Sequence, residues 1–164
     1  MLQAASKGGT TSATRSARAP LWIARWIRTP LVYRIALLGL CAAYLQGGFD
    51  KAIDFPGAVA EVQQFGLAPA VPLGFATITT ELVGAALILT GFYRWLGALS
   101  LAGFTLMATF LAKRFWEIPT PDRFMVENTF FEHLGLVGGF LLVAWQDVQE
   151  RRPTLLSTDG IIKK

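Results

Sequence analysis

Four long apolar segments constrain the fold of this chain more than any other feature of its sequence. They cover residues 31–49, 73–92, 95–112 and 129–145, and a helix needs roughly 17–25 mostly apolar residues to cross a bilayer. Only 16% of the 164 residues are charged, against about 25% in soluble domains. A soluble core of this size cannot bury several such segments, whereas a bilayer dissolves them. The sequence therefore predicts an all-α integral membrane protein, a four-helix bundle over residues 30–147.

The ends of the segments agree with this prediction. Pro30 and Pro72 fit the first turn of a helix, where a missing N–H costs nothing. Only Tyr93 and Arg94 separate the second and third segments, which predicts an antiparallel hairpin.

The flanking regions differ in character. Residues 1–20 lack acidic side chains and are rich in Ala, Ser, Thr and Gly, which predicts a disordered tail; an organelle transit peptide is the alternative. In residues 21–29, apolar side chains recur at helical spacing around Arg25 and Arg28. This pattern favours a short interfacial helix anchored by Trp22 and Trp26 over a simple extension of the first span. Residues 148–164 form a predicted C-terminal tail.

Basic residues indicate the orientation in the membrane. Eleven of the fifteen fall on one side of the predicted topology, namely Lys7, Arg15, Arg18, Arg25, Arg28, Arg34, Arg94, Arg151, Arg152, Lys163 and Lys164. Cytoplasmic loops carry the excess of Lys and Arg, so both termini are predicted to lie in the cytoplasm. The predicted membrane is a bacterial inner membrane. The net charge of +4 is thus explained by topology, and the chain is not expected to bind nucleic acid.

The counts of cysteine and histidine limit the chemistry. Cys41 is the single cysteine and lies within a span, so a disulfide or a thiolate metal site is not expected. His133 is the single histidine, so one chain cannot offer two axial imidazoles to a haem. We expect no metal and no cofactor bound by this chain alone.

Charged residues inside the apolar segments are the candidate site. Glu81 lies about 12 Å deep at 1.5 Å rise per residue, and an ionised carboxylate there needs a partner. The other polar residues of the same half of the bundle are Gln46, Asp50, Lys51, Glu132 and His133. One interpretation is an ion pair, Lys51–Glu81 or His133–Glu81, that fixes helix packing. The other is a site that binds a polar group and moves protons, with Glu81 and His133 as its catalytic residues.

Several motifs resemble the DoxX-like family of small membrane proteins. They are Gly47-Gly48-Phe49-Asp50-Lys51 with Asp54-Phe55-Pro56, then Gln64 to Pro69, Thr80-Glu81-Leu82-Val83-Gly84 through Arg94, and Asn128 to Leu134 with Gly138-Gly139. Together they extend over about residues 31–146. One departure is Phe55, which separates the Asp from the Pro of the family's turn. The tails before residue 30 and after residue 147 are not covered.

The resemblance implies a four-helix membrane bundle and an oxidoreductase role, since some members are membrane subunits of thiosulfate:quinone oxidoreductase. Our first hypothesis is a membrane component of a quinone-linked system, in which His133 or Lys51 donates a hydrogen bond to quinone and Glu81 handles protons. The second is an accessory subunit without chemistry that packs against other membrane subunits. A small transporter is the third.

Overall fold

The computed structural model describes residues 20–158, in which every regular element is helical. The tail predicted for residues 1–20 lies outside these residues except for Pro20, as do the last six residues of the C-terminal tail. The chain divides into two units, Met1–Tyr33 and Arg34–Lys164.

Within the first unit, α1 (Leu21–Ile27) ends shortly before α2 (Pro30–Ile53) begins. The Thr29 hydroxyl donates to the carbonyl oxygen of Trp26 at 2.8 Å and so satisfies a carbonyl at the end of α1. Pro30, which lacks an N–H, stands at the first position of α2. Trp22 and Trp26 are exposed.

The second unit continues α2 and adds a short helix at one end. In α3 (Phe55–Gln64), Asp54 is the N-cap and accepts a hydrogen bond from the Gly57 amide at 3.0 Å. The next helix, α4 (Ala70–Thr90), ends at Gly91, whose φ of 80° favours glycine. A tight turn then leads into α5 (Arg94–Ala112), as predicted for residues 93–94. The 3-10 turn η1 (Phe115–Glu117) precedes α6 (Arg123–Thr158).

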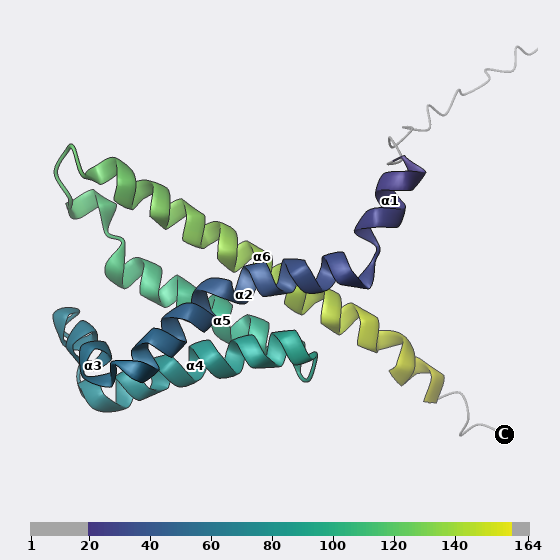
Figure 1. The fold of residues 1–164 in the computed structure, drawn as a ribbon, viewed down its shortest axis with the longest axis horizontal. Coiled ribbons are helices and arrows are strands. Elements are labelled where there is room, and N and C mark those ends of the chain that lie inside the picture. The colour runs from purple at the N-terminus through teal and green to yellow at the C-terminus, as the bar shows by residue number, and fades with distance from the viewer. Residues whose placement is uncertain (1–19, 159–164) are drawn as a thin grey trace, which may run out of the picture. The chain divides into compact units, whose positions relative to one another are not determined.

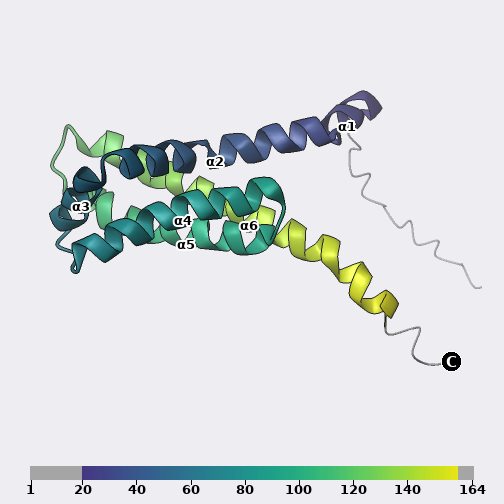
Figure 2. The ribbon, with the colours of Figure 1, turned by 60° about the horizontal axis from the view of Figure 1, so that its bottom comes forward.

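The long helices pack side by side along the second unit (Figures 1 and 2). The main contacts join α4 to α5 and α5 to α6, while α3 packs on α4. The Tyr44 ring of α2 meets Phe140 of α6 edge to face, with 5.3 Å between centroids. Where α4 and α5 cross, a Cβ added to Gly97 would lie 2.6 Å from the backbone oxygen of Gly84. Two glycines therefore permit the closest approach of these helices.

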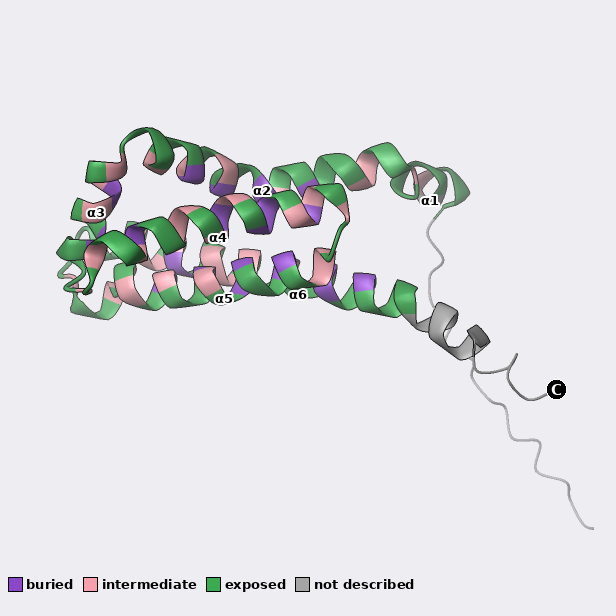
Figure 3. Cartoon of the chain, turned by 90° about the horizontal axis from the view of Figure 1, so that it is seen from below, coloured by how far each residue is buried: buried purple, intermediate pink, exposed green. Residues whose placement is uncertain are grey.

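Within residues 20–158, three helices are long and apolar enough to cross a membrane: Pro30–Ile53, Ala70–Thr90 and Arg94–Glu117. In Figure 3, exposed residues cover the outer faces of the helices, and the buried residues lie on the faces turned toward neighbouring helices. The outer faces carry large apolar side chains such as Leu38, Phe75, Val83, Leu106 and Leu142. A soluble monomer rarely exposes so much apolar surface, so the protein is a membrane protein surrounded by lipid.

Helix α6 differs from the sequence-based expectation. The predicted segment covered residues 129–145, whereas α6 is the 36-residue helix Arg123–Thr158 and is not among the three candidate spans. Hydropathy detects only its apolar middle. Side-chain pairs four residues apart support its polar ends, with Gln146 donating to Glu150 at 3.1 Å near one end and Arg123 3.7 Å from Glu127 at the other.

Candidate functional site

A cavity of about 330 Å³ opens among the helices of the second unit, at the end where α3 packs on α4. Residues from α2, α3, α4, α5 and α6 line it. Its walls are largely apolar, with Val62, Phe104 and Leu136 among them, and a few polar side chains converge on this apolar space. Such a combination is typical of small-molecule binding sites.

Lys51 and Glu81 form an ion pair in the wall of this cavity. The Lys51 ammonium donates to both carboxylate oxygens of Glu81, at 3.0 Å to Oε1 and 3.3 Å to Oε2. The side chain of Glu81 is 7% exposed and that of Lys51 is 22% exposed. Of the two pairings that the sequence left open, the structure contains Lys51–Glu81, which joins α2 to α4.

A glycine makes room for this pair. Gly47 precedes Lys51 by one helical turn, and a Cβ added there would lie 3.4 Å from Lys51 Nζ and 3.7 Å from Glu81 Oε2. The helical period places residues 47 and 51 on one face of α2, so the small residue borders the charged one. Gly47 also lines the cavity, and the pair is therefore reachable from it.

His133 lines the same cavity from α6 but does not contact Glu81 directly. Its Nδ1 lies 3.0 Å from the hydroxyl oxygen of Thr109 on α5. One turn along α5, the Thr105 hydroxyl lies 2.5 Å from the hydroxyl of Tyr44 on α2. Tyr44 and Thr105 also line the cavity, so two hydroxyl groups and one imidazole border it. Sequence reasoning missed these hydroxyl groups, although the four-residue spacing of Thr105 and Thr109 places both on one face of a helix.

The other predicted site residues lie elsewhere. Gln46 and Asp50 are exposed, and the Gln46 amide donates to the Asp50 carboxylate at 3.2 Å. They are exposed because the face of α2 that carries Gly47 and Lys51 is turned toward the cavity, and Gln46 and Asp50 lie on another face. Glu132 is exposed and accepts a hydrogen bond from Asn128. It follows that only one of the adjacent residues Glu132 and His133 reaches the cavity, as the 100° step of a helix requires.

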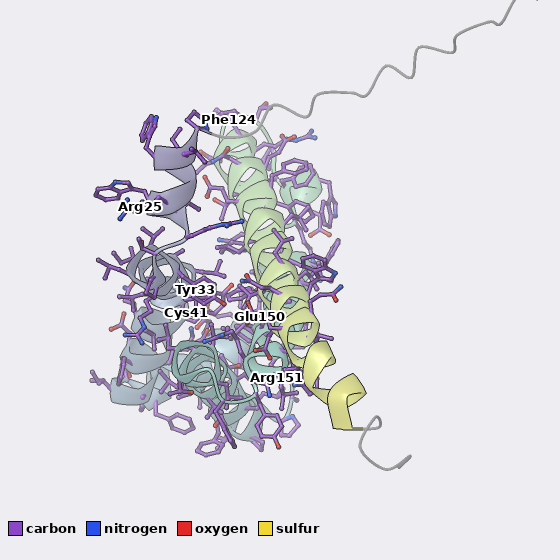
Figure 4. The ribbon with its side chains drawn as sticks, turned by 90° about the vertical axis from the view of Figure 1, so that its right-hand side faces the viewer. Arg25, Tyr33, Cys41, Phe124, Glu150 and Arg151 are labelled. Atoms are coloured by element: carbon purple, nitrogen blue, oxygen red, sulfur yellow. The ribbon has the colours of Figure 1, made fainter. Side chains whose placement is uncertain are left out.

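A second buried carboxylate, Asp147 of α6, lies at the α4–α5 turn, and sequence reasoning missed it. Its oxygens accept from the Trp95 amide at 3.3 Å and from Arg151 Nε at 3.0 Å, and Arg94 lies 4.0 Å away. Arg151, labelled in Figure 4, also reaches the Gly91 carbonyl oxygen at 3.4 Å. Asp147 stands at the polar edge of an apolar segment, where hydropathy predicts a solvated residue.

The fold and the cavity define an all-helical membrane protein with a polar site enclosed by apolar helices. A model of the DoxX family matches residues 30–114, more than half of the chain, and the protein therefore belongs to the DoxX family. The match includes Lys51 and Glu81 and ends before His133. The resemblance noted for residues 128–139 is outside it. No curated protein and no solved structure matches the chain.

Proposed function

We propose that this DoxX protein is the membrane-embedded component of a quinone-linked oxidoreductase system and that its cavity binds the quinone headgroup. One observation carries the proposal: a charged pair, Lys51–Glu81, faces an otherwise largely apolar cavity between lipid-exposed helices. A quinone headgroup is an apolar ring with hydrogen-bonding oxygens at its edge, and it reaches such a cavity from the bilayer.

The side chains of the pair retain capacity to bind a ligand. An ammonium group has three N–H donors, and Lys51 directs two of them at Glu81, which leaves one for a ligand oxygen. Each Glu81 oxygen accepts one bond from Lys51, whereas a carboxylate offers about four acceptor sites. In this proposal Lys51 orients the ligand, and Glu81 accepts or returns a proton at one of its oxygens.

Electrons require a second component. Bound quinone supplies two-electron, two-proton chemistry, and a partner subunit exchanges the electrons with it. A chain with one cysteine and one histidine offers neither two axial histidines for a haem nor the cysteine ligands of an iron–sulfur cluster. The proposal therefore places the protein beside other membrane or membrane-associated subunits.

The proposed membrane arrangement has four crossings. The apolar middle of α6, residues 129–145, packs along α5 and is the proposed fourth span. The excess of basic residues supports cytoplasmic termini, with Arg94 on the same side of a bacterial inner membrane. Reporter fusions at residues 60, 94, 120 and 160 test it. An extracytoplasmic signal at residue 160 would require an odd number of crossings.

Quinone content is the direct test of the proposed site. The full chain is purified in mild detergent, extracted with organic solvent and assayed for quinone, and a short-chain benzoquinone is then titrated into the protein. We expect quinone in the wild-type extract. Lys51→Met should weaken binding of the added benzoquinone roughly tenfold, because one charge-assisted hydrogen bond is lost.

Glu81→Gln tests the proposed proton-handling role, and Glu132→Gln is its matched control. Both replace a carboxylate by an amide of the same shape, but Glu132 is exposed and Glu81 lines the cavity. Only Glu81→Gln should change quinone-dependent turnover of the parent system. Equal binding by wild type, Lys51→Met and Glu132→Gln would place the quinone elsewhere.

A second candidate function is that of an accessory subunit, and one surface favours it. The first turn of α6 exposes two large apolar side chains that lie outside the apolar spans, Phe124 and Met125. Lipid tails do not naturally cover this segment, whereas a partner protein would. Purification of a stoichiometric partner without any extractable quinone would favour this function over the first.

A further inference from the structure

Two threonine hydroxyls on α5 have their only hydrogens committed. Thr105 Oγ1 lies 2.6 Å from the Leu101 carbonyl oxygen, and Thr109 Oγ1 lies 2.6 Å from the Thr105 carbonyl oxygen. A carbonyl oxygen only accepts, so each hydroxyl must donate to it. Because a hydroxyl has one hydrogen, both threonine oxygens can only accept from any further partner.

This commitment fixes the direction of two more hydrogen bonds. The Tyr44 hydroxyl, 2.5 Å from Thr105 Oγ1, donates to it. His133 Nδ1, 3.0 Å from Thr109 Oγ1, must carry a hydrogen and donate as well. A neutral imidazole has one N–H, so Nε2 is left with a lone pair. A neutral ring is expected because the cavity is largely apolar and a second cation, Lys113, lines it beside His133 and opposes a positive charge on the ring.

The ring of His133 lines the cavity, and within residues 20–158 its Nε2 has no hydrogen-bond partner. We infer that His133 presents an unprotonated Nε2 to the cavity and that the site selects a ligand with a hydroxyl group at that position. The class of ligand rests on the proposed function: among quinone headgroups, it is the reduced form, the hydroquinone. Lys51 can donate to an oxygen of either form, whereas only the hydroquinone can donate to Nε2.

The state of His133 is measurable without any ligand, because the chain has a single histidine. Full-length protein labelled with ¹⁵N-histidine, with its purification tag removed, gives one set of imidazole nitrogen signals. We expect a protonated Nδ1 and a bare Nε2. Thr109→Val removes the acceptor and should return the ring to the Nε2–H tautomer, which free histidine favours. Thr109→Ser keeps the hydroxyl and should preserve the wild-type signals.

Thr79→Val is the matched control. The Thr79 hydroxyl bonds to the Phe75 carbonyl oxygen of its own helix at 2.8 Å and does not line the cavity. This variant should leave the imidazole signals unchanged. A wild-type ring protonated at Nε2, alone or together with Nδ1, would overturn the inference.

Ligand preference is the second readout. Anaerobic titrations compare a short-chain hydroquinone with the matching benzoquinone. Wild type and Thr109→Ser should bind the hydroquinone about tenfold more tightly, the worth of one additional hydrogen bond, and Thr109→Val should lose this preference. If both forms bind equally to a wild-type protein with bare Nε2, the selectivity is refuted while the quinone site stands. If neither form binds, the proposed function fails while the tautomer assignment stands.

Discussion

Two buried carboxylates lie toward opposite ends of the second unit, and their surroundings differ. Glu81 and Asp147 are each 5% exposed, and each is paired with a basic side chain. Asp147 receives hydrogen bonds from Arg151 and from the backbone amide of Trp95, and it has no place in the cavity wall. Glu81 is bonded by Lys51 and faces the cavity. Burial alone does not distinguish the two residues.

Unused acceptor capacity does distinguish them. Asp147 accepts a hydrogen bond from the Trp95 amide at the start of α5, where the positive end of the helix dipole stabilises a negative charge. No side chain of α5 or its N-cap residue caps this end of the helix. It therefore serves as a cap supplied by another helix, a structural role. Glu81 retains acceptor positions and contacts space that a ligand can fill. A buried charge whose hydrogen-bonding capacity is satisfied thus has a structural role, whereas a partly satisfied charge beside a cavity marks a candidate binding site.

Loss of Asp147 should have the largest effect on folding. Asp147→Ala removes the buried carboxylate that accepts from the Trp95 amide and pairs with Arg151, and breaking a buried charged pair costs about 3–5 kcal/mol. We expect a large loss of folded protein by size-exclusion chromatography and a lower melting temperature. Glu150→Ala is the control, because Glu150 is exposed and accepts from Gln146 alone among the described residues. Equal stability of the two variants would contradict the structural role of Asp147.

Lys51→Met should destabilise the protein less, by roughly 2 kcal/mol, since Lys51 is partly exposed and the cavity can admit water beside Glu81. The double variant Lys51→Met/Glu81→Gln removes both charges. It should recover part of the loss, because no unpaired carboxylate remains. A coupling of about 1–3 kcal/mol in the double-mutant cycle is expected for groups in direct contact. Additive effects in thermal unfolding would show that the pair contributes nothing to stability.

The sequence predicted the two sites unequally, and the reason is physical. Glu81 interrupts an apolar run, so its burial and its need for a partner follow from hydropathy. Asp147 lies where the apolar segment gives way to polar residues, and only its packing against the α4–α5 turn buries it. The helical content, the tight turn at Tyr93 and the depth of Glu81 are local properties of the chain. Which of Lys51 and His133 meets Glu81 depends on the rotation of three helices about their axes, which apolar segments of low periodicity do not fix.

Gly97→Ala should have an intermediate effect by separating α4, which carries Glu81, from α5, whose Trp95 amide donates to Asp147. The crossing of α4 and α5 lies one turn beyond Glu81 on α4 and close to Trp95 on α5. A Cβ on Gly97 would lie 2.6 Å from the backbone oxygen of Gly84, so the helices must move apart at a cost of about 1–3 kcal/mol. Gly103→Ala on the same helix is the control, because a Cβ there meets nothing within 4 Å. Thermal unfolding of both variants measures the difference.

The smallest effect is expected for Asp50→Asn, which defines the boundary of the Glu81 site. Asp50 is one residue from Lys51, yet it is exposed and its carboxylate accepts from Gln46 at 3.2 Å. An exposed contact of this kind contributes little, so the free energy of unfolding should change by no more than about 0.5 kcal/mol. The affinity for a short-chain benzoquinone should also stay within about twofold of wild type. Lys51→Met, by contrast, should lower this affinity roughly tenfold, because it removes one charge-assisted hydrogen bond. If Asp50→Asn weakened binding as much as Lys51→Met does, the ligand would contact the outer face of α2. The contrast between a cavity-facing pair and solvated neighbours would then no longer explain which charged residues of this helix are functional.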